Sequence, residues 1–203
     1  MQQSVRREAI VASGRGAYIL SIMTTHSWKI DTAHSGVHFS VRHMVVSKVR
    51  GRFGRFEGEV QYDPAHPERS KVKAVIDASS IDTNEPKRDE HLKSPDFFDV
   101  AKYPQLSFES TTVEKKGDRL QIAGKLTMHG VTRDIVLDTE VLGVGKDPWG
   151  VERLGFAAKA TLDRKDYGLG WNQLLETGGV LVGDKIEIEL EIEAVAAAAQ
   201  KAA

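Results

Sequence analysis

The segment K-I-E-I-E-L-E-I-E-A at Lys185–Ala194 decides the fold, because apolar and charged side chains alternate along it. Every second residue from Ile186 to Ile192 is aliphatic, and the residues between them are glutamates. A period of two residues is that of a β-strand, and strict alternation is typical of an antiparallel strand with one buried and one solvated face.

The same alternation recurs along the rest of the chain. It predicts about nine strands, at Trp28–Asp31, Val37–Val41, Phe56–Tyr62, Val72–Ile76, Leu106–Phe108, Leu120–Leu126, Ile135–Val141, Leu154–Ala158 and Ile186–Ile192. Turn signals rich in glycine, proline and aspartate separate these segments. The best helix signal is the short polar stretch Pro86–Leu92, which ends before Pro95.

Many antiparallel strands with short connections and little helix favour an all-β fold, here a single antiparallel barrel of about eight strands with one short helix. A barrel of about eight strands is wide enough to hold one small ligand. The predicted inward faces carry small residues, which would leave room there: Gly58, Ala74, Gly124, Ala158 and Ala160. Small residues also suit the taper of a small barrel, so they suggest a cavity without demonstrating it.

Composition excludes several classes of protein. The chain has 203 residues and a mass of 22.4 kDa, which favours a single domain. With 28 Lys and Arg against 29 Asp and Glu, it lacks the basic excess of a protein held mainly by phosphates. It contains no cysteine, so disulfides, thiolate metal sites and thiol nucleophiles are excluded.

The two ends of the chain lack the alternating pattern of its middle. Arg6 and Arg7 precede an apolar stretch, but Arg15 interrupts it and no small-residue cleavage site follows, unlike a secretion signal. We expect residues 1–27 to be a disordered leader or a misassigned start, with Met23 as the alternative start. Residues 28–195 are expected to form the barrel, and residues 196–203 a disordered tail. We therefore expect a cytoplasmic protein, or a periplasmic one if the leader acts as a signal. No stretch reaches the roughly 18 apolar residues of a membrane span.

Motifs for metal binding and catalysis are weak. His34 and His38 have the spacing H-x-x-x-H, but their segment is extended, which separates them by about 13 Å, too far for one ion. The chain has no G-x-S-x-G elbow, Gly-rich phosphate loop or H-E-x-x-H motif. We interpret the acids and bases of Lys87–His91 as a solvated turn. These observations predict no catalytic residue, no metal and no cofactor.

The stretch Arg42–Phe56 is the one basic cluster, with arginines interleaved between phenylalanines. This pattern would suit single-stranded nucleic acid, but strand alternation explains it more simply, and we expect no nucleic acid partner. His43 continues the parity of Phe39 and Val41 on the predicted inward face, so it is expected either as a hydrogen-bonded rim residue or as a polar group near a pocket mouth.

Several blocks of sequence together resemble the YceI-like family, polyisoprenoid-binding proteins with a lipocalin-like barrel. They are W-K-I-D-T-A-H-S-G-V-H-F-S-V-R-H at Trp28–His43, K-V-R-G-R-F at Lys48–Phe53, S-I-D-T-N-E-P-K-R-D-E-H-L-K-S-P-D-F-F-D at Ser80–Asp99, Y-P-Q-L-S-F-E-S at Tyr103–Ser110, L-T-M-H-G-V-T-R at Leu126–Arg133, D-R-K-D-Y-G-L-G-W-N at Asp163–Asn172 and L-V-G-D-K-I-E-I at Leu181–Ile188. They occur in order and cover essentially the whole predicted domain.

The resemblance implies a barrel that binds one long isoprenoid, a polyprenyl or quinone-like lipid, as carrier, store or protector and without catalysis. The predicted pocket lining is Phe39, Val41, Leu106, Phe108, Ile122 and Leu137. The predicted polar rim is His43, Asp89, His91, Tyr167, Trp171 and Asn172. For Asp89 and His91 an equal alternative is that they only order the turn before Phe97.

Two other functions remain open at this point. The barrel would serve an enzyme acting on a small apolar substrate in the same cavity, because a site can be built on any fold. It would also serve an interaction protein that pairs through a sheet edge or an apolar patch, and a homodimer is compatible with the sequence.

Overall fold

The computed structural model describes residues 26–44, 46–174 and 180–197. Most of the expected leader, Met23 included, and residues 198–203 of the expected tail lie outside this part of the chain. Two residues of the expected leader belong to the first strand, which begins at His26, and the last strand ends at Ala196.

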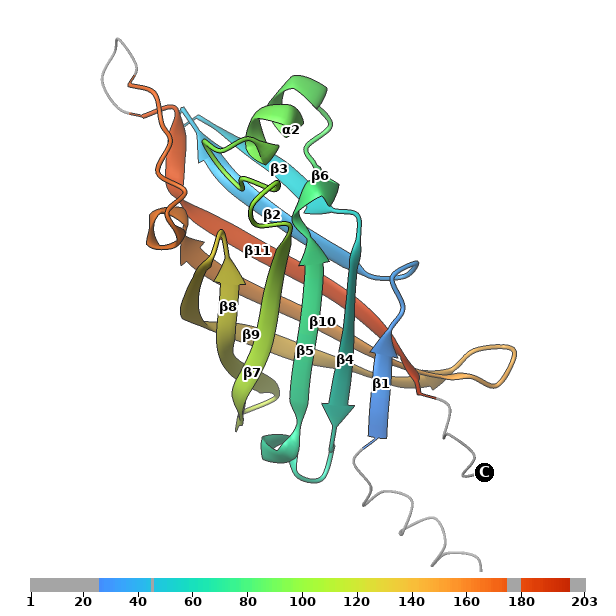
Figure 1. Ribbon diagram of the computed structural model, residues 1–203. Helices are drawn as coiled ribbons and strands as arrows, with labels where there is room; N and C mark the ends of the chain where they lie inside the picture. Colours follow the sequence, from blue (N-terminus) through green and yellow to red (C-terminus); the bar gives the residue numbers. More distant parts are fainter. Residues whose placement is uncertain (1–25, 45, 175–179, 198–203) are drawn as a thin grey trace, which may run out of the picture.

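Eleven strands and one short α-helix make up the described chain (Figure 1). The strands are β1 (His26–Ile30), β2 (Gly36–His43), β3 (Ser47–Phe53), β4 (Phe56–Tyr62), β5 (Lys71–Asp77), β6 (Ile81–Asp82), β7 (Gln105–Lys116), β8 (Arg119–Met128), β9 (Val131–Lys146), β10 (Glu152–Asp163) and β11 (Val182–Ala196). The helix is α2 (Pro86–Lys93), and 3-10 turns lie at Pro67–Arg69, Ala78–Ser80 and Arg164–Tyr167.

The strands close into a ring of eight positions. The ring runs β1-β4-β5-β7-β8-β9-β10-β11 and returns from β11 to β1. The long strand β11 pairs with β2 along Val182–Glu191 and with β1 at Ala194–Ala196, so β1 and β2 share one position. In the same way, β3 and β4 share one position of the ring, and β5 and β6 share another. The predicted barrel of about eight strands with one short helix is thus confirmed.

The side chains of β11 alternate between the barrel interior and the solvent, as predicted. Ile186, Ile188, Leu190 and Ile192 face the barrel interior, while the glutamates between them are exposed. Two strands, β3 and β6, were missed by the sequence analysis. Glycine occupies an inward position of β3 at Gly51, and β6 is only two residues long, so neither has an alternating apolar run.

Aromatic rings occupy the space beside two inward glycines. A Cβ atom at Gly124 would lie 2.5 Å from the ring of Phe108, and one at Gly51 would clash with the ring of Phe39. The expectation that Gly124 leaves open space is therefore wrong, because the Phe108 ring fills it. Ala74 and Ala158, in contrast, do line the interior cavity.

The two ends of the barrel differ. Trp28, Val60, Leu154, Phe156 and Ala194 form a buried cluster between β1, β4, β10 and β11. At the other end α2 lies over the opening, at the top of Figure 1, while the β9–β10 hairpin projects to the lower right. The barrel is therefore packed at the β1 end, and the opening to consider is the one beneath α2.

Candidate functional site: an apolar cavity with a polar mouth

An elongated cavity of about 240 Å³ runs through the barrel interior. All six predicted lining residues border it: Phe39, Val41, Leu106, Phe108, Ile122 and Leu137. They meet there because each occupies an inward position of its strand. Their contact with a ligand stays a prediction.

Few polar side chains border this interior cavity. The lining is otherwise apolar, and its polar or ionisable side chains are those of Tyr62, Ser70, Thr139 and Arg164. His38 also borders the cavity, but its side chain is exposed on the outward face of β2. Thr139 Oγ1 donates to the Leu137 carbonyl at 3.3 Å, and Ser70 Oγ accepts from the Asp63 amide at 3.2 Å. These hydroxyls are bonded to the backbone, so they offer no pair of groups for acid–base chemistry.

A second cavity of about 630 Å³ lies at the mouth, under α2. Five residues line both cavities, so the two spaces adjoin: Phe39, Val41, Leu92, Phe97 and Val182. Three predicted rim residues, His43, His91 and Trp171, line this mouth. Its charged members come from the start of α2 and the residue before it, namely Glu85, Lys87 and Arg88.

An aromatic cluster lines the mouth, and one of its rings, Phe97, also borders the interior cavity. The His91 ring lies edge-on to Phe97 and to Trp171, with centroid distances of 5.1 and 4.7 Å, and Phe97 lies 5.3 Å from Trp171. His91 Nε2 also lies 3.0 Å from the Asp96 carboxylate. His91 therefore both borders the cavity and orders the turn that follows α2.

Asp89 does not line either cavity. Its carboxylate accepts hydrogen bonds from the amide and the hydroxyl of Thr83, the amide at 2.9 Å. Arg88 binds the same threonine, with Nε at 2.7 Å from Oγ1 and Nη2 at 2.9 Å from the carbonyl oxygen. Asp89 thus holds the junction between β6 and α2, before the helix and not at the turn that precedes Phe97.

Tyr167 and Asn172 are also absent from both linings, contrary to their predicted place at the rim. Tyr167 is 2% exposed within the core, and burial raises the pKa of its phenol. The Asn172 amide bonds the backbone of Val182 at 2.7 and 3.0 Å, as a neighbouring strand would. Both residues support the loop between β10 and β11.

Arg164 is a buried cation beside the interior cavity that the sequence analysis missed. Its side chain is 3% exposed, and its guanidinium donates to the carbonyls of Gly183 at 2.9 Å, Trp171 at 2.9 Å and Leu169. Desolvation lowers its pKa, and the carbonyls replace the lost water. The signal was present, because Arg164 continues the inward parity of Ala158 to Leu162.

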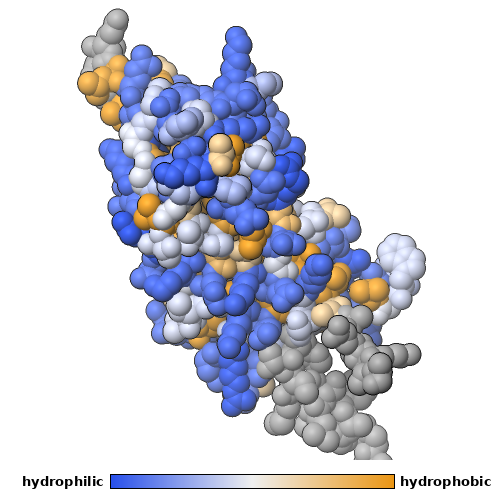
Figure 2. Space-filling view, viewed as in Figure 1, coloured by the Kyte–Doolittle hydropathy of each residue, from blue (hydrophilic) through white to orange (hydrophobic). Residues whose placement is uncertain are grey.

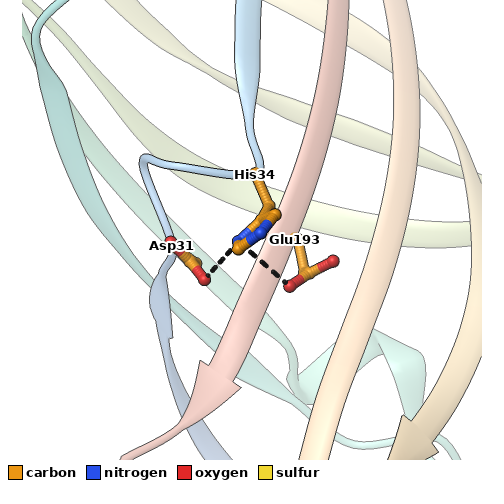
Figure 3. Close-up of side chains that lie close together, drawn as sticks. All are labelled: Asp31, His34 and Glu193. Carbon is orange, nitrogen blue, oxygen red and sulfur yellow. Dashed lines mark hydrogen bonds and ion pairs between the residues drawn. The ribbon is translucent and has the colours of Figure 1, made fainter. Parts of the chain in front are cut away.

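A cluster of charges joins the chain near β1 to β10 and β11 (Figure 3). His34 Nδ1 lies 2.8 Å from Asp31 and 3.7 Å from Glu193. Arg153 donates to the Asp31 carboxylate at 2.8 Å and also to Glu193, so a guanidinium already binds both carboxylates. The cluster is an ion-pair network that closes the barrel, and His38, four residues from His34, projects elsewhere as an exposed side chain.

Asp31→Asn is expected to remove part of the acid sensitivity of folding. Hydrogen bonds from His34 and Arg153 lower the pKa of Asp31 from 3.8 to about 2. Its carboxylate therefore stabilises the fold above about pH 4, and this contribution is lost as the pH falls from about 4 to about 2. Solvent screening limits it to about 1 kcal/mol.

Urea unfolding at neutral pH and near pH 2 checks this prediction. The free energies of unfolding of wild type and Asp31→Asn should differ at neutral pH and converge in acid. Asp118→Asn is the matched control, because Asp118 is exposed and forms no ion pair within the described chain. An equal stability difference at both pH values would contradict the role given to Asp31.

The fold and the two cavities define a class, that of closed antiparallel β-barrels with an apolar interior cavity. A scan of family models matches the YceI-like domain over residues 28–194. A UPF0312 protein of Vibrio cholerae is 38% identical over 194 residues, which is 93% of this chain and 98% of that protein. The chain belongs to the YceI-like family.

Solved structures share the barrel. The YceI protein of Campylobacter jejuni is 32% identical with a TM-score of 0.66, over 77% of this chain and 90% of that one. A polyisoprenoid-binding domain from Saccharophagus degradans is 15% identical with a TM-score of 0.62, over 86% of this chain and all of that one. In the described part of this chain, no helix has the length and apolar character needed to cross a membrane.

Proposed function

We propose that the protein binds one long-chain isoprenoid, a polyprenyl or quinone-like lipid, inside the barrel, and carries, stores or protects it. The observation that carries this proposal is the apolar interior cavity with a polar mouth beside it. The fold is shared with the polyisoprenoid-binding domain from Saccharophagus degradans.

The division of polarity fits such a lipid. Each CH₂ group that moves from water into the interior contributes about 0.8 kcal/mol, so a long tail needs no charged contact there. A polar head group would lie at the mouth, where Lys87, Arg88 and His91 offer hydrogen-bond donors. We propose binding without catalysis, and the backbone hydrogen bonds of the interior hydroxyls of Ser70 and Thr139 support this.

Native mass spectrometry followed by organic extraction tests the proposal directly. The purified protein is expected to show a mass excess of several hundred daltons, released as a polyprenyl or quinone species. If the protein is isolated without ligand, it is titrated with an isoprenoid quinone. No mass adduct at saturating quinone would overturn the proposal.

Trp171 is expected to report the same titration. It lies in the mouth beside His91 and Phe97, so a quinone entering there should quench its fluorescence. The measurement uses Trp149→Phe as background, because Trp149 is 84% exposed at the far hairpin. Adding Trp171→Phe should remove most of the signal change while the mass adduct persists. Quenching that is unchanged without Trp171 would place the ligand elsewhere.

A further inference from the structure

Two loops at the open end of the barrel expose apolar side chains. Met44 and Val46, in the β2–β3 turn, are 43% and 81% exposed. Leu174 and Val180, in the segment before β11, are 81% and 36% exposed and pair as an isolated β-bridge. The Met44 amide donates to the Leu181 carbonyl at 2.9 Å, so the two loops lie side by side. We call Met44, Val46, Leu174 and Val180 the apolar tip.

The apolar tip adjoins the mouth of the cavity. His43 and Leu181, the chain neighbours of Met44 and Val180, both line the mouth cavity. Figure 2 shows hydrophobic side chains gathered at the upper left end of the molecule, where the segment before β11 lies in Figure 1. A lipid that leaves the interior through the mouth therefore passes beside the apolar tip.

Unpaired basic side chains flank the tip. Arg42 and Arg50 are exposed on β2 and β3, and Lys87 is exposed at the mouth. None of the three forms an ion pair with another residue that the structure describes.

The nearby acids are largely engaged. Glu187 on β11 accepts from Lys48 and Ser40, and Asp184 pairs with Lys165 at 2.9 Å. On α2, Glu90 pairs with Lys93, while Glu85 accepts from the Lys87 amide. The surface around the mouth thus combines exposed apolar side chains with exposed cations that form no ion pair within the described chain.

We propose that the apolar tip docks this protein on an anionic lipid bilayer, with the barrel mouth facing the membrane. Exposed apolar side chains enter the interfacial region of a bilayer, and the flanking cations are attracted to anionic head groups. Charge complementarity selects a membrane over a second copy of the chain, because two copies would bring like charges together. The inference goes beyond isoprenoid binding, since docking requires no ligand in the barrel.

Vesicle sedimentation of the full chain tests docking. The protein is expected to sediment with vesicles of phosphatidylethanolamine and phosphatidylglycerol, and much less with vesicles of phosphatidylcholine alone. The vesicles contain no isoprenoid, so docking is measured separately from ligand binding. Failure of docking therefore leaves the mass adduct unaffected, and failure of ligand binding leaves sedimentation unaffected. Absence of sedimentation with the anionic vesicles would overturn the docking proposal.

The double variant Val46→Glu with Leu174→Glu should lower partitioning at least about tenfold, because it replaces apolar insertion by like-charge repulsion. The matched control is Leu142→Glu with Trp149→Glu. Leu142 and Trp149 are 61% and 84% exposed on β9 and the β9–β10 hairpin, away from the mouth. An equal loss in both double variants, or none in the first, would show that the tip does not dock.

Charge reversal gives a second, independent comparison. Arg50→Glu is expected to weaken partitioning about fivefold or more, whereas Lys115→Glu on β7 leaves it close to wild type. Both residues are exposed and without an ion pair in the described chain. A concentration-dependent dimer that is lost in the tip variant, without vesicle binding, would assign the tip to a subunit interface and contradict docking.

Discussion

Phe108→Arg is expected to empty the barrel of isoprenoid, whereas Glu109→Arg, one residue further along β7, leaves the lipid bound. Phe108 borders the interior cavity and is 9% exposed. Glu109 faces solvent and pairs with Lys73 at 2.8 Å. A guanidinium in the apolar interior would keep water there, so we expect affinity to fall at least about a hundredfold. Native mass spectrometry with an added isoprenoid quinone measures the difference.

Because a buried charge also weakens folding, a second variant keeps this test decisive. Ala158→Phe adds apolar volume to the cavity wall without adding charge, since Ala158 lines the interior and is 7% exposed. Overpacking costs about 1–3 kcal/mol, which leaves a typical domain folded. Circular dichroism confirms the fold. Folded Ala158→Phe that binds lipid as wild type does would mean that the interior is not the binding site.

Arg164→Met should destabilise the protein by about 3–5 kcal/mol. The substitution removes the donor to four carbonyls, those of Leu169, Trp171, Val182 and Gly183, in a place with little access to water. Those carbonyls belong to the β10–β11 connection and the start of β11, so the mouth loses its support at the same time. Urea unfolding measures the change.

Lys165→Met is the matched control. Lys165 follows Arg164 in the chain, but it is 52% exposed and pairs with Asp184 on the surface. Its loss should change the free energy of unfolding by no more than about 0.5 kcal/mol. Similar effects of the two substitutions would show that the buried hydrogen bonds of Arg164 are not what stabilises the mouth.

Much of the barrel was predictable because strand parity is a local property. The period of two along Ile186–Ile192 names the inward residues without knowledge of any partner strand. Parity also identified Phe108 and Leu137 as members of one lining before their strands were known to be close. It fails at Gly51, where the inward position of β3 has no apolar side chain to complete the pattern.

The mouth was less predictable, because its polar contacts join distant segments. Asp89 and Asn172 carry hydrogen-bonding groups suited to a ligand, yet both side chains form hydrogen bonds with backbone atoms of nearby segments. Arg164 continues an inward parity, but its partners in the loop and in β11 become its neighbours only after folding. For a polar side chain, residue type and parity predict which face of the strand it occupies. The contacts that decide its role come from tertiary structure.

The pairing of β1 with β11 has a consequence for how the chain acquires its cavity during synthesis. Trp28, Lys29 and Ile30 pair with Ala196, Val195 and Ala194, so the ring is closed by segments near the two ends of the described chain. Until the ribosome has delivered β11, neither β1 nor β10 has this neighbour, and the strands form an open sheet. Contacts between residues so distant in sequence form slowly. A lipid can therefore be enclosed only after translation has passed the last strand.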